Sequence, residues 1–133
     1  MKKRAGIRAA AAVCILVMGM FLFRGQRPYR NLKASDLISA SVCLTPPDET
    51  VPITEPDALV SCLRELVIGR KDQSYTEYSG QAVTFTLVLT DGSRQEILVC
   101  NPFVVINGTG YRAEYGPCER LSSYANKLLD RTK

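Results

Sequence analysis

The sequence predicts an α+β fold: an antiparallel sheet covered on one face by two helices, behind an N-terminal transmembrane helix. An apolar run at residues 9–23 with basic flanks is typical of a membrane segment. Residues 82–115 alternate apolar and polar side chains between Asp-Gly and Asn-Gly turns, which predicts a four-stranded meander. Stretches with helical apolar spacing flank this meander, so the domain is predicted to be a two-layer sandwich.

The apolar run from Ala9 to Phe23 is interpreted as an uncleaved signal-anchor. Its length corresponds to about 22 Å of helix, which is short for a hydrocarbon core of about 30 Å and also typical of signal peptides. No small-residue cleavage motif follows Phe23, which favours retention, and Arg8 can lengthen the span by reaching the headgroups. A secreted domain behind a cleaved signal peptide is the alternative. A buried soluble helix is disfavoured because the run has no polar face.

Charge divides the chain near residue 33. Residues 1–33 contain eight of the 17 Lys and Arg residues and no Asp or Glu, whereas the remaining residues have a net charge of −4. Basic residues flank the apolar run on both sides, so the charge rule alone does not give its orientation. The very short N-terminal tail and its compact basic cluster favour a cytoplasmic basic tail at residues 1–8, a juxtamembrane stalk at residues 24–35 and an acidic extracytoplasmic domain at residues 36–131. Nucleic acid is not an expected partner, because the domain lacks a basic stripe.

The domain is predicted to begin with a strand and a helix. In residues 36–44 every second side chain from Ile38 onward is apolar, which predicts a half-buried strand. Residues 51–53 form a short extended piece. A helix is then expected to start after Thr54, because threonine caps helices well, and to end at Gly69.

A polar loop leads from this helix into the meander. The Asp91-Gly92 and Asn107-Gly108 pairs supply residues that tolerate the positive φ of tight hairpin turns. The predicted strands span residues 82–90, 95–100, 103–106 and 111–115. Apolar spacing over residues 118–129 predicts the closing helix.

Four cysteines lie in the domain, and in an exported protein they permit two disulfides. The second and fourth meander strands run parallel, so Cys100 and Cys118 meet at one edge of the sheet and form the predicted disulfide. Cys43 and Cys62 form the secondary pair. Free buried thiols are the open alternative. A zinc site built from all four thiolates is disfavoured because no Cys-x-x-Cys pair is present, and no metal or other cofactor is expected.

The sequence contains no catalytic signature. It has no histidine, which excludes Ser-His-Asp and Cys-His nucleophiles and zinc sites built on histidine. Tyrosines are the candidate contact residues of an interaction surface, namely Tyr75, Tyr78, Tyr111 and Tyr115. The carboxylates from which an acid–base pair could be drawn are Glu77, Asp91, Glu96 and Glu114.

Three motifs between Gly80 and Leu128 resemble a known group of domains. They read F-T-L-V-L-T-D-G, N-P-F-V-V-I-N-G-T-G-Y and L-S-S-Y-A-N-K-L-L. They are similar to small, uncharacterised extracytoplasmic α+β domains of Gram-positive bacteria, chiefly Firmicutes, that follow a single N-terminal span or a lipoprotein signal. The resemblance covers most of residues 36–130 and implies a cell-surface location and no known reaction. The cysteines are not part of its pattern.

We therefore predict a membrane-tethered interaction or sensory domain that faces the outside of the cell and has no catalytic activity. Its expected partners are the membrane, through residues 9–23 and their basic flanks, and a protein at the cell surface. The first alternative is an accessory subunit or assembly factor of a membrane complex. The second is a cell-surface enzyme that uses a carboxylate pair.

Overall fold

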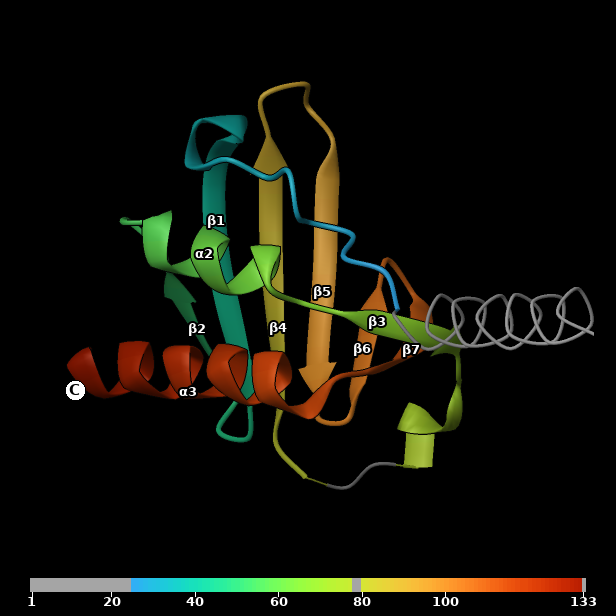
Figure 1. Ribbon diagram of the computed structural model, residues 1–133. Helices are drawn as coiled ribbons and strands as arrows, with labels where there is room; N and C mark the ends of the chain where they lie inside the picture. The colour runs from blue at the N-terminus through green and yellow to red at the C-terminus, as the bar shows by residue number, and fades with distance from the viewer. Residues whose placement is uncertain (1–24, 78–79, 133) are drawn as a thin grey trace, which may run out of the picture.

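Figure 1 shows the computed structural model of the protein, which describes residues 25–77 and 80–132. The described chain folds into a seven-stranded sheet with two α-helices packed against it. In chain order the elements are η1 (Ala34–Asp36), β1 (Leu37–Thr45), β2 (Glu49–Pro52), α2 (Asp57–Arg64), β3 (Ile68–Lys71), η2 (Ser74–Glu77), β4 (Ala82–Leu89), β5 (Arg94–Cys100), β6 (Phe103–Ile106), β7 (Thr109–Ala113) and α3 (Tyr115–Arg131). The predicted α+β class with an antiparallel sheet and two helices is therefore confirmed.

The sheet has the strand order β2-β1-β4-β5-β6-β7-β3, and every neighbouring pair is antiparallel. Strands β4 to β7 form the predicted meander, and β1 extends it beside β4. Strands β2 and β3 add one edge each and were not predicted as strands. The end of the predicted first helix is therefore wrong: α2 stops at Arg64, and Gly69 lies in β3 instead of capping a helix.

Strand β3 forms because pairing with β7 holds its backbone in an extended conformation. Ile68 pairs with Ala113 of β7 and is 5 % exposed. A β-branched side chain such as Ile68 has a preference for extended backbone, and pairing with β7 satisfies its main-chain groups. This contact is distant in sequence, so helical spacing alone could not reveal it.

The central strands place alternate side chains in the core. Val83, Phe85 and Leu87 of β4 are fully buried between the sheet and the helices, as their alternation predicts. In β1 the alternation also holds, except at Ile38, which is 64 % exposed. A register irregularity between Leu37 and Ser39 shifts the pattern there, so Leu37 packs against the core in its place.

Both helices lie on one face of the sheet (Figure 1). Helix α3 begins at Tyr115, three residues before the predicted start at Cys118, so Tyr115 belongs to the helix and not to the last strand. The core-facing residues of α3 include Cys118, Leu121 and Ala125, all fully buried. This stripe fixes the rotation of α3 and therefore decides which of its side chains remain open to solvent.

The N-terminal part of the described chain packs on the domain, although the sequence predicts a stalk there. Gln26 exchanges two main-chain hydrogen bonds with Ile68, at 2.7 and 2.8 Å. The guanidinium of Arg27 donates to the carbonyl oxygen of Arg64 at 3.0 and 2.6 Å. Tyr29 is 8 % exposed in the core and donates from its hydroxyl to Gln95 Oε1 at 3.3 Å. Residues 25–33 are therefore part of the folded domain.

The predicted anchor at residues 9–23 lies outside the described residues. Within residues 25–77 and 80–132, no helix combines the length and the apolar character that a membrane crossing requires.

Candidate binding groove

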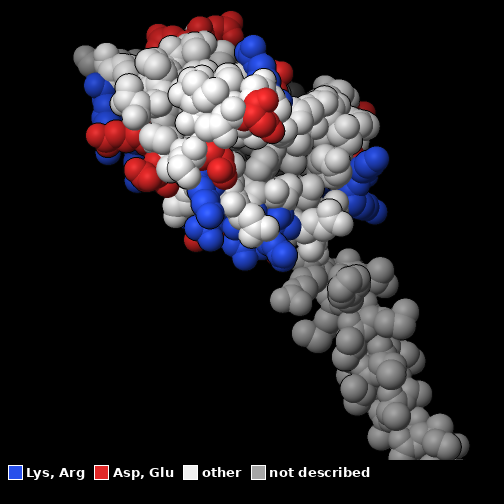
Figure 2. Space-filling model, turned by 90° about the horizontal axis from the view of Figure 1, so that it is seen from above, with Lys and Arg blue, Asp and Glu red and all other residues white. Residues whose placement is uncertain are grey.

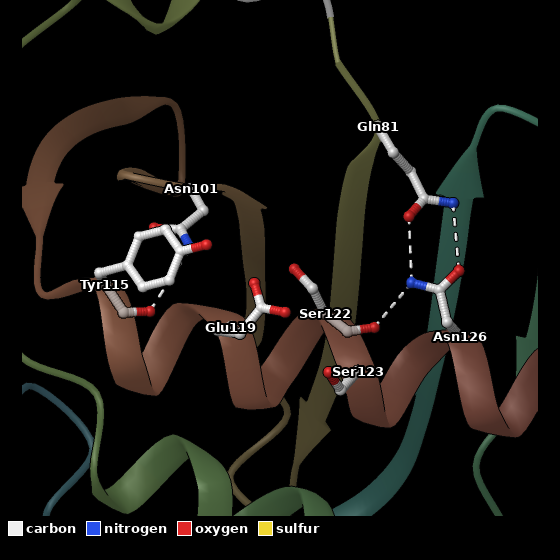
Figure 3. A pocket seen from close by; sticks show the side chains of 7 residues that line it. All are labelled: Gln81, Asn101, Tyr115, Glu119, Ser122, Ser123 and Asn126. Atoms are coloured by element: carbon white, nitrogen blue, oxygen red, sulfur yellow. Dashed lines mark hydrogen bonds between the residues drawn. The ribbon is translucent and has the colours of Figure 1, made fainter.

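A polar groove with a volume of about 370 Å³ runs along helix α3. Its walls are α3, the start of β4 and the turn between β5 and β6, as Figure 3 shows. The residues that line it are Gln81, Asn101, Tyr115, Glu119, Ser122, Ser123 and Asn126. We call this feature the α3 groove.

One side of α3 supplies most of the lining. Tyr115, Glu119, Ser122 and Asn126 recur at a spacing of four, three and four residues, which places them in a line on one side of a helix. The neighbouring stripe of α3 is buried against the sheet. Because that apolar stripe can dock in one rotation only, it turns the polar line into the groove.

A pair of amide side chains closes one end of the groove. Gln81 Nε2 donates to Asn126 Oδ1 at 3.3 Å, and Asn126 Nδ2 donates to Gln81 Oε1 at 3.0 Å (Figure 3). Asn126 Nδ2 also donates to the carbonyl oxygen of Ser122 at 2.8 Å, and Gln81 Nε2 to that of Pro46 at 3.0 Å. The two amides are therefore held in fixed orientations, with α3 joined to the residue before β4.

Asn101 lies at the other end of the groove, close to Tyr115. Its Nδ2 donates to the carbonyl oxygen of Tyr115 at 3.4 Å. Its Oδ1 is buried and has no hydrogen-bond partner among the described residues. A buried acceptor without a donor costs about 1–3 kcal/mol, so the fold leaves one polar atom unsatisfied at this end of the groove.

The groups between these two ends are free to bind. In residues 25–77 and 80–132, the carboxylate of Glu119 and the hydroxyls of Ser122 and Ser123 have no hydrogen-bond partner. None of the described lining residues is Lys or Arg. The groove therefore offers hydrogen bonds and one negative charge, which suits a neutral or cationic ligand. Its volume lies near the lower limit of small-molecule sites, so it has room only for a small molecule.

The structure separates the predicted tyrosine contact residues. Tyr115 is 67 % exposed and lines the α3 groove, but Tyr111 is half-buried against the core. The Tyr75 ring lies against Gly110, whose side of the sheet is opposite to that of Tyr111 because side chains alternate along β7. Tyr78 lies outside the described residues. These tyrosines do not form one continuous surface.

The predicted Cys100–Cys118 disulfide is not formed in the structure, where the four domain cysteines are free thiols. Cys118 lies fully buried in the core, and Cys100, the last residue of β5, is 2 % exposed and close to it. Burial first, and the nearby Cys100 second, raise the pKa of the Cys118 thiol to about 12. Both thiols are therefore protonated at neutral pH, and whether they can be oxidised stays a prediction.

The secondary pair, Cys43 and Cys62, is also unbridged. Cys43 lies between the core residues Val42 and Leu44 of β1, so it faces the side of the sheet that the helices leave open. Cys62 lies on α2 and packs against the core on the helix side. The sheet separates these two thiols, which also prevents all four cysteines from meeting at one metal ion.

The carboxylates considered for acid–base chemistry come from different parts of the fold. Glu77 belongs to η2, Asp91 to the β4–β5 turn, Glu96 to β5, and Glu114 precedes the first residue of α3. Asp91 Oδ1 accepts a hydrogen bond from the Ser93 amide at 2.8 Å, which is a turn-forming contact. None of these four residues lines the α3 groove with Glu119. Among the described residues, no group of three or more potential metal ligands forms either.

Sequence reasoning missed most of the groove. Of its lining residues, it singled out only Tyr115 as a contact residue. The missed signal was a polar line, Glu119, Ser122 and Asn126, on the helix face beside the apolar stripe. Gln81 and Asn101 had no local signal, because the fold brings them to α3 from distant positions.

Comparison of the chain with protein-family models, with curated proteins and with solved structures gives no match.

Proposed function

We propose that this protein is a membrane-tethered extracytoplasmic domain that binds a small amino sugar in the α3 groove. The tether is the apolar run of residues 9–23, with basic residues on both sides. Its N-terminal basic tail stays in the cytoplasm and the domain faces outside. The domain acts as a sensory or binding module, without a reaction of its own.

The chemistry of the groove supports this class of ligand. Amide and hydroxyl groups can both donate to and accept from the hydroxyl and acetamido groups of a sugar. The Glu119 carboxylate can pair with an amino group, and the exposed ring of Tyr115 offers an apolar face with a polar tip. An anionic ligand is disfavoured, because no cation lines the groove to balance the negative charge of Glu119.

The observation that carries the proposal is that Asn101 Oδ1 has no hydrogen-bond donor among the described residues. This atom is buried and lacks a donor within the described chain, yet it belongs to a residue that lines an open groove. An N–H or O–H group of a ligand would satisfy it once the neighbouring side chains move aside and expose it. The fixed amide pair at the far end then supplies a second point of attachment for a small ring.

The test is an NMR titration of the full chain in detergent micelles, with the side-chain amides of Asn and Gln labelled with ¹⁵N. The probes are N-acetylglucosamine, glucosamine and glucose 6-phosphate. We expect the first two to shift the Asn101, Gln81 and Asn126 side-chain signals, and the anionic sugar to leave them unchanged. Each side-chain signal reports on its own end of the groove.

A matched pair of variants controls for non-specific binding. Ser122→Leu fills the groove from α3 and should abolish the shifts. Ser61→Leu makes the same change at an exposed position of α2, away from the groove, and should keep them. Shifts that persist in the Ser122→Leu variant, or the absence of shifts with every probe, would contradict the proposal.

A further inference from the structure

The start of the described chain has a fixed position on the domain. Gln26 is bonded to Ile68 of β3 through its main chain, and the side chains of Arg27 and Tyr29 attach the following residues. Gly25 lies close to the same edge, since a Cβ atom built on it would be 2.9 Å from the carbonyl oxygen of Ile68. From Gly25 onward the chain is therefore attached to the domain beside β3.

This attachment limits the distance between β3 and the membrane. Gly25 is separated from Phe23, the last residue of the apolar run, by Arg24 alone. A fully extended chain advances at most about 3.6 Å per residue, so Gly25 lies within about 7 Å of the end of that run. The headgroup layer on each side of a bilayer is about 5–8 Å thick. With the apolar run inserted as proposed above, the edge of the domain at β3 is at the level of the headgroups.

Basic side chains surround this edge. Arg27 and Arg30 line a hollow with Gly25 and Gln26, and Arg70 and Lys71 are exposed residues of β3. Figure 2 shows Lys and Arg side chains on both sides of the point where the described chain begins. We call these four residues, Arg27, Arg30, Arg70 and Lys71, the basic edge.

The charges of the basic edge are not balanced by the protein. Within the described residues, Arg30, Arg70 and Lys71 have no ion-pair or side-chain hydrogen-bond partner, and Arg27 binds an uncharged carbonyl group. Glu114 also borders Gly25, but it is a single carboxylate against four cations. Residues 34–133 have a net negative charge, so the positive charge concentrated beside the proposed tether is opposite in sign to that of the domain as a whole.

We infer that the basic edge docks on anionic lipid headgroups and holds the domain in one orientation on the membrane. This inference rests on the proposed tether and not on the proposed ligand. Each basic side chain near an anionic surface adds attraction equivalent to a factor of about five in affinity. In this orientation β3 faces the lipid, while the opposite end of the sheet, at β2, points away from it.

Lysine acylation of the reconstituted full chain tests the orientation. The protein is placed in vesicles of phosphatidylcholine alone, or of phosphatidylcholine with phosphatidylglycerol, and labelled with a water-soluble succinimidyl ester. Mass spectrometry compares Lys71 with Lys127, an exposed lysine on α3. In anionic vesicles we expect the Lys71 to Lys127 rate ratio to fall by at least about fivefold, and high salt to restore it.

Two charge-reversal variants with the same net change separate docking from general charge effects. Arg30→Glu with Arg70→Glu alters the basic edge and keeps Lys71 as the reporter, so the lipid dependence should disappear. Arg94→Glu with Arg131→Glu alters exposed residues of β5 and α3 and should retain it.

The outcomes distinguish the separate claims. A Lys71 to Lys127 ratio that is equal in both kinds of vesicle, with the protein embedded, overturns the docking and leaves the tether intact. Failure of the chain to remain with the vesicles after alkaline washing overturns the tether and the docking together. Neither result affects the sugar titration of the α3 groove, because that titration is made in micelles.

Discussion

At the scale of single residues, the cysteines show how burial controls chemical behaviour. Cys100 and Cys118 are 2 % and 0 % exposed, and burial raises the pKa of both thiols. Cys43 and Cys62 are half-buried. Only a thiolate that reagents can reach reacts readily, so protein structure and not sequence position decides which of the four domain cysteines is reactive.

The first prediction concerns this difference in reactivity. Iodoacetamide at pH 8 should modify Cys43 first, and should leave Cys100 and Cys118 unmodified until denaturant is added. Peptide mass spectrometry with and without denaturant measures the order. Purification without reductant is the informative control, since a linked Cys100–Cys118 peptide in that sample would establish the disulfide that the sequence predicts and would contradict the free thiols.

At the scale of elements, the segment that follows β3, residues 72–77, is attached to the face of the sheet that the helices leave uncovered. Asp72 accepts hydrogen bonds from the Ser74 hydroxyl and amide, at 2.5 and 2.9 Å, and pairs with Arg112 of β7 at 2.9 Å. These contacts, led by the Ser74 hydroxyl, lower the pKa of Asp72 to about 2. The guanidinium of Arg112 in turn lies 4.9 Å from the centre of the Phe103 ring. The main chain can approach β7 closely here because residue 110 is glycine.

The second prediction tests that close approach. A Cβ atom at Gly110 would lie 2.5 Å from the carbonyl oxygen of Asp72 and 2.6 Å from the Tyr75 ring. Gly110→Ala should therefore lower the free energy of unfolding by about 1–3 kcal/mol. At Gly69 of β3 the nearest atom would be 3.6 Å away, an ordinary contact, so Gly69→Ala should change stability by less than about 0.5 kcal/mol. Urea denaturation measures both, and equal effects of the two changes would refute the steric explanation.

Elements whose signals are local could be predicted from the sequence. The alternation in β4 and the Asp91-Gly92 turn together specify a hairpin whichever way the rest of the chain folds. Strand β3 could not be predicted in the same way, because it depends on β7, whose paired residues come 40 and 45 positions later. The α3 groove depends on the same kind of distant contact, since Gln81 and Asn101 complete a site that α3 only begins.

At the scale of the whole molecule, the domain begins earlier than the charge pattern indicates. The basic composition of residues 24–35 predicts a solvated stalk, but Tyr29 is a core residue and Leu32 packs against the core. A single buried aromatic ring removes enough apolar surface from water to hold a short segment in place. Removal of this segment would therefore open the core.

The third prediction measures how much this segment contributes. Tyr29→Ala should lower the free energy of unfolding by about 3 kcal/mol, because it leaves a cavity between the sheet and residues 25–33. Tyr115→Ala removes the same atoms from an exposed site and should cost less than about 0.5 kcal/mol. Chemical denaturation of both variants provides the comparison. A solvated stalk would instead make the two changes equally mild.

The short outer strands of the sheet, β2 and β3, also affect how easily two copies of the domain could pair through their sheets. A long, flat outer strand offers unpaired N–H and C=O groups on which a second copy could add its own strand, and such addition leads to aggregation. Here β2 spans only Glu49–Pro52 and ends in a proline, and part of β3 is occupied by Gln26. Neither outer strand of the described sheet therefore offers a long free edge on which a second copy could add its own strand.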